Sequence, residues 1–189
     1  EAEKSRLNDE RVQEKEDAFR SIFTQPVVAK KMEWAIKWLE TSAFEEQIVA
    51  FSAVELILFS STFAGIFGFK ALDKKMEGLY TANEWISRDE TVHGEFATFL
   101  YNNYVSNKLE DSKIKEILLE AFEVEKQFIE DSFGTGVIGF SKDKMIQYVQ
   151  YVTDTVLGYY NIEQHFKVVQ PFPYMDLLAL PRRDNFFEK

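Results

Sequence analysis

Residues 48–69 read IVAFSAVELILFSSTFAGIFGF, and the only charged side chain in this 22-residue stretch is that of Glu55. Apolar residues occur on every side of the predicted helix, which is typical of a helix buried in a core. The stretch is also long enough to cross a bilayer. A carboxylate near its middle, together with several hydroxyl groups, disfavours membrane insertion. We therefore expect one continuous core helix over residues 44–69.

The segments that flank this stretch have helical periodicity. Apolar residues recur at three- and four-residue intervals over residues 27–39, 81–104, 112–133 and from Ser141 onward. We expect Pro26 either to end the preceding turn or to open the first of these helices, and Thr81 or Asn83 to be the N-cap of the second. No run of strand periodicity and no internal repeat occurs. The sequence predicts an all-α bundle.

The length of 189 residues predicts one domain over residues 1–189, or two at most. The small number of glycines and prolines predicts few, long elements. Within the chain we predict a polar lead-in over 1–17, a loop at GTGVIG (134–139) and an irregular tail over 170–189. The net charge of −10 disfavours nonspecific nucleic-acid binding. The absence of cysteine excludes disulfides, thiolate metal sites and a cysteine nucleophile, and fits a reducing compartment.

Glu55 is the most informative single residue. An isolated carboxylate in an apolar core costs several kcal/mol, which is of the order of the stability of a small domain. Glu55 must therefore be protonated, paired with a cation or bound to a metal. One interpretation is a protonated or hydrogen-bonded glutamate that packs against a serine.

Glu90 and His93 form a Glu-x-x-His motif in the predicted helix 81–104. Residues three apart share a helix face, so a carboxylate and an imidazole can converge there on iron, manganese or zinc. In a chain with 32 acidic residues such a motif also arises by chance, as a surface ion pair. The second histidine, His165, follows Ile162 by three positions and makes no second motif, so we interpret it as an ordinary loop or helix-end histidine.

The combination of the two features is more specific than either one. Ferritin-like bundles hold two metal ions with one Glu from each of two helices and a Glu-x-x-His from each of two others. This sequence contains one member of each type, with Glu90 35 positions after Glu55. It therefore supplies half of such a site.

Two stretches, FSAVELILFSSTFAGIF (51–67) and NEWISRDETVHGEFA (83–97), resemble the small, radical-generating subunit of class I ribonucleotide reductase, nearest its eukaryotic and viral form. Further similarity lies in PVVAKKMEWAIKW (26–38), QPFPYM (170–175) and NFFEK (185–189). The resemblance implies a ferritin-like helical bundle. It also implies an oxidoreductase that activates oxygen at two metal ions and oxidises a tyrosine.

The resemblance assigns a role to each matching position. Glu55, Glu90 and His93 match ligands of a di-iron centre, for which manganese is the alternative metal. Asp89 matches an aspartate on the radical-transfer route and Arg88 a neighbour linked to that route. An apolar pocket that shields the radical is matched by Phe59, Phe63 and Ile86. Aromatic residues on a buried helix are also ordinary core residues, and that alternative stays open for Phe59 and Phe63.

The family resemblance also implies partners. They are the large subunit, to which the radical passes for deoxyribonucleotide synthesis, and a second copy of the completed small subunit. It implies a cytoplasmic enzyme of DNA replication, with neither nucleic acid nor membrane as a partner.

Some features of the family have no counterpart in the sequence. These are the first ligand, the first Glu-x-x-His, the radical tyrosine and the tail that docks on the large subunit. The polar run EAEKSRLND (1–9) does not resemble the apolar helix expected there. We expect the chain to match the second half of the core and to need the missing amino-terminal half as a partner, with the remaining ligands outside this chain. That half is then a separate, cleaved or omitted segment, or the chain is a degenerate relative.

Two other functions compete with this one. The chain could be a metal-poor structural partner that stabilises an active small subunit in a heterodimer, although such a role does not need a buried Glu55. It could also be a related oxygen-activating or ferroxidase bundle, which the ISRDE string (86–90) and NFFEK argue against.

Overall fold

Helices and turns form the regular structure, and no strand occurs among the residues that the structure describes. The computed structural model describes residues 11–17, 20, 25–40, 43–72, 75–132 and 141–175. The helices of the bundle are α2 (Pro26–Glu40), α3 (Phe44–Leu56), α4 (Ser60–Ala71), α5 (Glu77–Tyr104), α6 (Asp111–Ser132) and α7 (Lys142–Tyr159). The predicted all-α fold is confirmed.

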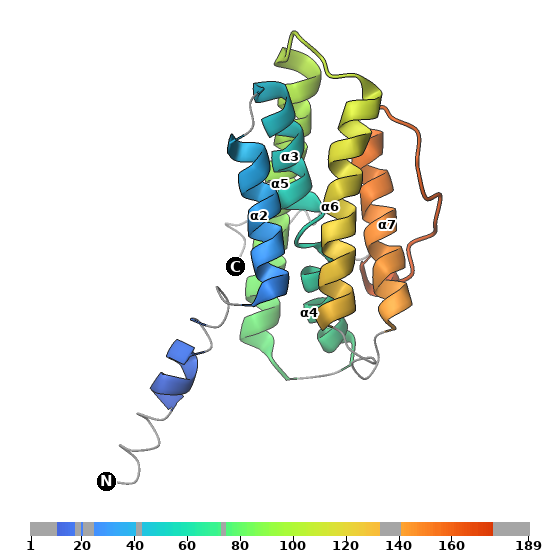
Figure 1. Cartoon of the computed structure of the whole chain (residues 1–189). Coiled ribbons are helices and arrows are strands. Elements are labelled where there is room, and N and C mark those ends of the chain that lie inside the picture. The colour runs from blue at the N-terminus through green and yellow to red at the C-terminus, as the bar shows by residue number, and fades with distance from the viewer. Residues whose placement is uncertain are drawn as a thin grey trace, which may run out of the picture.

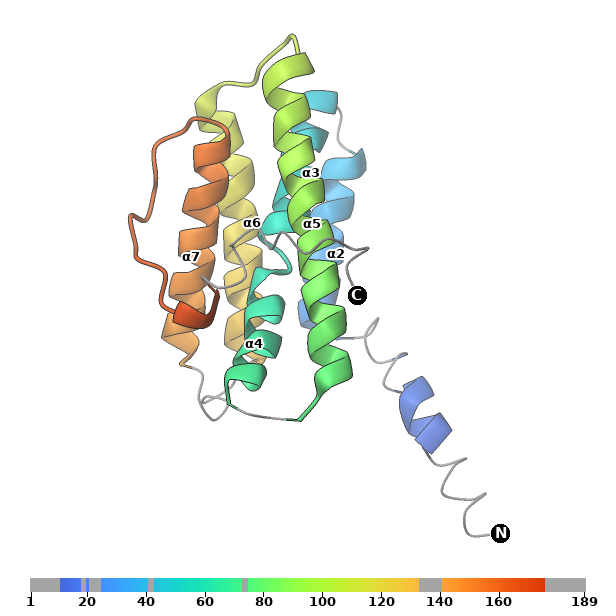
Figure 2. The same ribbon diagram turned by 180° about the vertical axis from the view of Figure 1, so that it is seen from behind.

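Helices α3 and α4 follow one another along the axis of the bundle (Figure 1). Between them they contact α2, α5, α6 and α7, so this segment is the centre around which the other helices pack. Helix α6 packs against α2 and α7, and α5 runs along the opposite side of the bundle (Figure 2). After α7 the chain returns along the outer side of that helix and forms a short helical turn at residues 173–175.

The starts of two helices follow from the local sequence as expected. Pro26 is the first residue of α2, where its missing amide proton costs nothing. Ser141 precedes α7, and its side chain accepts a hydrogen bond from the amide of Lys144. The predicted start of α5 is wrong, because that helix begins at Glu77 and Asn83 lies inside it. The Asn83 side chain is buried and donates to the carbonyl of Phe63 at 3.3 Å, so it joins α5 to α4 rather than capping a helix.

The prediction of one continuous helix over residues 44–69 is also wrong, because a turn at residues 57–59 separates α3 from α4. The Ala53 carbonyl accepts from the amides of both Ile57 and Leu58, which closes α3. Ser60 then donates its hydroxyl to the Ile57 carbonyl at 2.8 Å. Glu55 consequently lies near the end of a helix rather than at its middle.

Buried apolar side chains from all the helices of the bundle form one core. Its fully enclosed members include Val49, Ile117, Leu118, Met145 and Val149. The segment Phe44–Ala71 has the length and hydropathy of a membrane span, with a mean hydropathy of 1.8 over its most apolar window, of which 56% is buried in the fold. Core helices pass the same test, and the packing of α3 and α4 against four other helices supports the core-helix interpretation.

Several predicted segments lie partly or wholly outside the described residues. The loop at 134–139 lies entirely outside them, as do residues 1–10 of the lead-in and 176–189 of the tail. Of the lead-in, residues 11–17 are helical and exposed.

Candidate metal centre

Three potential metal ligands converge between the end of α3 and the middle of α5. The Nδ1 atom of His93 lies 3.0 Å from Oε2 of Glu90 and 3.7 Å from Oε2 of Glu55. One ligand atom from each residue lies within 4.8 Å of the other two. Glu90 and His93 meet because they are one helical turn apart on α5. Glu55 joins them because α3 packs closely along α5.

Gly94 permits this close packing of the two helices. A Cβ atom at Gly94 would lie 2.3 Å from Cγ of Leu56, which is far inside van der Waals contact. Leu56 directly follows Glu55, and Gly94 directly follows His93. The leucine therefore fills the space that a side chain at position 94 would need, at the level where the ligands meet.

The three groups differ in exposure, and their protonation follows from it. The side chains of Glu55, Glu90 and His93 are 12%, 24% and 54% exposed. Burial, together with its hydrogen bond to Glu90, raises the pKa of Glu55 to about 7. Accepting that hydrogen bond lowers the pKa of Glu90, while the hydrogen bond to Glu90 raises the pKa of His93. Near neutral pH the cluster thus shares protons that a cation would displace.

The donor set fits a transition metal. Two carboxylates and an imidazole suit iron, manganese or zinc, and a partly buried carboxyl with a raised pKa is typical of a site that gains its counter-charge from a ligand. No second group of this kind occurs among the described residues. Within that part of the chain the site offers three potential protein ligands to a metal.

Two of the three residues predicted for the radical pocket are exposed. Phe63 is half-buried, and its ring centroid lies 6.2 Å from that of Phe59. Phe59 and Ile86 are 41% and 49% exposed, so the described residues do not enclose them. The shielding role of these three residues stays a prediction.

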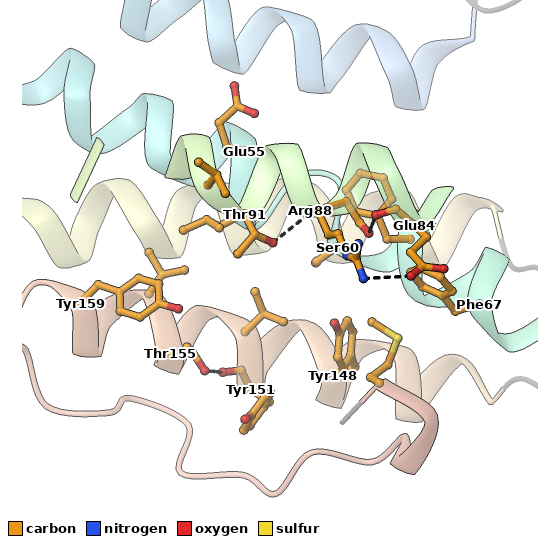
Figure 3. A pocket seen from close by; sticks show the side chains of 17 residues that line it. Glu55, Ser60, Phe67, Glu84, Arg88, Thr91, Tyr148, Tyr151, Thr155 and Tyr159 are labelled. Carbon is orange, nitrogen blue, oxygen red and sulfur yellow. Dashed lines mark hydrogen bonds and ion pairs between the residues drawn. The ribbon is translucent and has the colours of Figure 1, made fainter. Parts of the chain in front are cut away.

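A cavity of about 540 Å³ lies between α4, α5 and α7, next to the candidate metal centre (Figure 3). Phe63 and Arg88 line it, opposite Tyr148, Tyr151 and Tyr159 of α7. In Figure 3 the Glu55 carboxylate points away from the side chains of α7 that line the far wall of this cavity.

The two residues predicted for radical transfer lie beside Glu90 on α5. Arg88 forms an ion pair with Glu84 at 3.0 Å inside the cavity. Asp89 is exposed, and its negative charge contributes to the raised pKa of His93. His165 lies outside the site: its side chain is exposed, and its backbone amide donates to the carboxylate of Asp154 at 2.7 Å.

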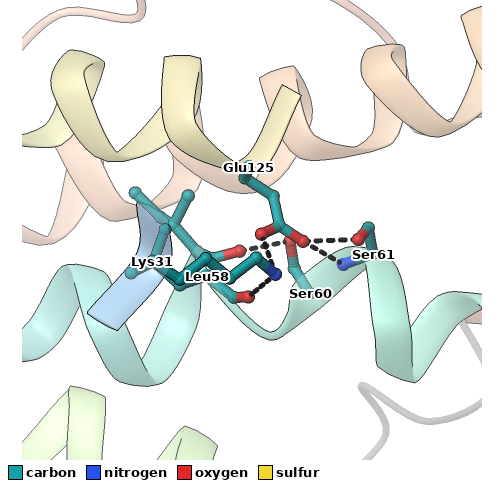
Figure 4. Close-up of polar contacts among 6 residues, drawn as sticks. Lys31, Leu58, Ser60, Ser61 and Glu125 are labelled. Carbon is teal, nitrogen blue, oxygen red and sulfur yellow. Dashed lines mark hydrogen bonds and ion pairs between the residues drawn. The ribbon is translucent and has the colours of Figure 1, made fainter. Parts of the chain in front are cut away.

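Sequence reasoning missed the buried carboxylate of Glu125 on α6. It is fully buried and forms an ion pair with Lys31 of α2 at 2.5 Å (Figure 4). Burial raises the pKa of Glu125, while Lys31 and Ser61 act in the opposite direction. The sequence held a signal for this residue, because Glu125 occupies a position in the apolar stripe of its helix.

The chain matches the family model "Ribonucleotide reductase, small chain" over residues 6–171. It is 41% identical to one of the ribonucleoside-diphosphate reductase small chains of Arabidopsis thaliana, over 93% of this chain and 53% of that protein. It is 40% identical to the corresponding protein of Trypanosoma brucei brucei, over 93% of this chain and 52% of that protein. The chain thus spans about half the length of the curated relatives it matches.

Solved structures have the same fold. The Rnr4 homodimer of ribonucleotide reductase from Saccharomyces cerevisiae superimposes with a TM-score of 0.73 at 29% identity, over 82% of this chain and 49% of that chain. A Bacillus halodurans protein described as a class I ribonucleotide reductase superimposes with a TM-score of 0.76 over 87% of this chain and 64% of that one. At 20% identity the second likeness concerns the fold alone.

Proposed function

The chain belongs to the ribonucleotide reductase small-chain family, and from this we propose that it forms part of a ribonucleoside-diphosphate reductase small subunit, to which it supplies half the ligands of a two-metal centre. The observation that carries the proposal is the convergence of Glu55, Glu90 and His93 from two neighbouring helices. Two carboxylates and an imidazole in this arrangement form the half-site that such a centre requires.

Each of the three side chains has its own part in holding the metal. Glu90 and His93 bind as a pair from one face of α5. Glu55 approaches from α3 and must first lose its proton, since metals bind the deprotonated carboxylate. When bound, iron or manganese supplies the oxygen activation that oxidises a tyrosine in the proposed subunit.

The residues around the ligands protect and route the radical in this proposal. Phe59, Phe63 and Ile86 keep water from the oxidised tyrosine, for which apolar side chains are suited because they offer no hydrogen bonds. Asp89 and Arg88 lie on the route by which the radical leaves. The charge of Asp89 already acts on the ligand His93, which supports its inclusion.

An exposed apolar face of α5 supports a requirement for partners. Trp85, Val92, Phe96 and Phe99 share one side of the helix and are 66%, 61%, 57% and 51% exposed. In the proposed assembly this face packs against the polypeptide segment that carries the remaining ligands and the radical tyrosine. The completed units pair as a homodimer, as in the Rnr4 structure, and pass the radical to a large subunit in the cytoplasm.

A metal-poor structural partner is the less favoured function. Such a protein has no need for three convergent ligands, one of them a carboxyl that burial makes harder to ionise.

Metal content tests the proposal directly. The chain is purified from its native source with any polypeptide that accompanies it, and iron and manganese are measured by elemental analysis. We expect two metal ions per completed unit, and Glu55→Ala, Glu90→Ala or His93→Ala each to reduce this content strongly. Glu77→Ala, an exposed carboxylate on the same helix, is the matched control.

The chain by itself should hold one ion and not two, because three ligands leave a pair of metals under-coordinated. Two irons per isolated chain, with an oxo-bridge absorption band, would refute the half-site. Unchanged metal content in all three ligand variants would refute the assignment of the ligands.

A further inference from the structure

The turn between α3 and α4 replaces helical hydrogen bonds by side-chain contacts. In a continuous helix the Ser61 amide would bond to the Ile57 carbonyl, and the Leu58 carbonyl would accept from residue 62. Here the Ser61 amide donates to Oε1 of Glu125 at 3.3 Å, and its hydroxyl donates to the same oxygen. The Leu58 carbonyl accepts from Nζ of Lys31 at 2.6 Å.

Lys31 and Glu125 thus hold the two sides of the turn and also hold each other. Their ion pair, at 2.5 Å, joins α2 to α6 across the turn, and Lys31 lies 3.6 Å from the ring centre of Phe128. The Glu125 side chain is fully buried and that of Lys31 is 14% exposed. Figure 4 shows both charged groups directed at the turn, Lys31 from α2 and Glu125 from α6.

The signs of the charges match the helix ends that they face. Lys31 meets a free carbonyl at the end of α3, where the helix dipole is negative. Glu125 meets the amide and hydroxyl at the start of α4, where the dipole is positive. Reversing the pair would oppose both dipoles, so the arrangement suits this interruption of the helix and not a generic core contact.

Glu55 lies in the last turn of α3, directly before the interruption. We propose that Lys31 and Glu125 are positioning residues for the metal centre, which fix the end of α3 and thereby the place of Glu55 beside Glu90 and His93. The inference rests on the proposed function for its metal, but the placement of Glu55 is a property of the chain without metal. Neither residue touches a ligand.

Paired and single substitutions separate positioning from simple stability. Glu125→Gln and Lys31→Met each leave one buried charge alone, and either variant can fail to fold for that reason. The double variant Lys31→Met/Glu125→Gln removes both charges at nearly constant volume, and we expect it to fold. It still lacks the donor to the Leu58 carbonyl, so the end of α3 remains released. Lys37→Met/Glu120→Gln is the matched control, since that pair joins the same two helices at 2.8 Å on the surface.

The first readout needs no metal. The chain has two histidines, so the imidazole ¹H–¹⁵N signals of His93 are readily assigned by comparison with His93→Gln. We expect these signals to shift in the double variant and to stay unchanged in the surface control. Unchanged His93 signals in a folded double variant would overturn the inference, because Glu55 would then hold its place without the ion pair.

The second readout is the affinity for Co²⁺, followed by its visible absorption. We expect the double variant to bind Co²⁺ about 10- to 100-fold more weakly than the parent chain, as is usual for outer-shell changes, and the control to match the parent. A double variant with parental affinity would show that the pair serves stability alone. If the parent chain itself binds no Co²⁺, the proposed metal site is contradicted, and the His93 signals still decide the positioning inference.

Discussion

Two carboxylates of the bundle, those of Glu55 and Glu125, have contrasting surroundings. Glu125 is fully buried, and the chain supplies its counter-charge, Lys31, together with two donors from Ser61. Glu55 is 12% exposed, and its neighbours are another carboxylate and a half-exposed imidazole. A buried acid that has its own cation has its charge balanced within the chain. A partly buried acid that lies against a second acid is suited to bind a cation from outside the chain.

The largest loss of stability is expected when Glu125 loses its counter-charge, Lys31. Lys31→Met leaves Glu125 buried without its cation, and loss of one partner of a buried pair costs about 3–5 kcal/mol. We expect the urea midpoint to fall sharply at unchanged slope. Glu55→Gln should produce no such loss in the absence of metal, and equal destabilisation by both variants would erase the distinction between the two sites.

A smaller effect is expected where the two ligand helices touch. Gly94→Ala places a Cβ atom 2.3 Å from Cγ of Leu56 and should cost about 1–3 kcal/mol by overpacking, which outweighs the roughly 1 kcal/mol gain in helix propensity. Thermal melts and Co²⁺ titration measure the two consequences. Adding Leu56→Ala to Gly94→Ala should restore most of the thermal stability and most of the Co²⁺ affinity.

Gly78 is the matched control for this substitution, because it lies on the same helix and a Cβ there meets nothing within 4 Å. Gly78→Ala should be neutral or slightly stabilising. A Gly94→Ala variant that behaves the same way would show that α3 and α5 need no close approach.

The pH dependence of stability tests the surroundings of Glu55. The pKa of Glu55 is about 7 in the folded chain, above the ordinary value of 4.5. Because the folded state holds this proton more tightly, its contribution to stability is full below pH 4.5 and is lost as the pH rises through 7. Without metal, Glu55→Gln should therefore be more stable than the parent at pH 8, by about 1 kcal/mol after screening by water, and equal to it at pH 4. A parent chain as stable as the variant at pH 8 would show that burial and the neighbouring Glu90 do not raise the pKa of Glu55 in this way.

The smallest effect is expected for the exposed counterpart of the buried pair. Lys37 and Glu120 join α2 to α6 with side chains that are 52% and 36% exposed. A double-mutant cycle with Lys37→Met and Glu120→Gln should give a coupling of about 0.2–1 kcal/mol that disappears in 1 M salt. A coupling as large as that of Lys31 and Glu125 would mean that burial is not what separates the two pairs.

The fold could be predicted from the sequence wherever apolar periodicity alone decides it. The bounds expected for α6 and the start of α7 agree with the structure to within a residue. Both helices are amphipathic, with one apolar and one polar face, and Ser141 is a typical N-cap for the start of α7. The turn at residues 57–59 could not be predicted this way. It interrupts a stretch whose local sequence favours a helix, and the groups that stabilise it come from α2 and α6.

The candidate site could be predicted from the sequence for a similar reason. Glu90 and His93 are neighbours on one helix, so their spacing places them together, and the apolar context of Glu55 marks it as unusual. The distance between α3 and α5 could not be predicted from the sequence, because it depends on how Leu56 packs over Gly94. Lys31 carried no signal of its own among the other charged residues of α2.

The contacts at the turn also bear on the order in which parts of the structure form during folding. The Ser61 amide reaches Glu125 across 64 residues of chain, and the Leu58 carbonyl reaches Lys31 across 27. Contacts between distant residues form late, since a long loop must close before they are made. We therefore expect the end of α3 to be completed only after α6 has docked, and the ligand cluster to assemble no earlier than that. Pulse-labelling hydrogen exchange should find the Ser61 amide protected in the last phase, and metal added before that phase should meet no site.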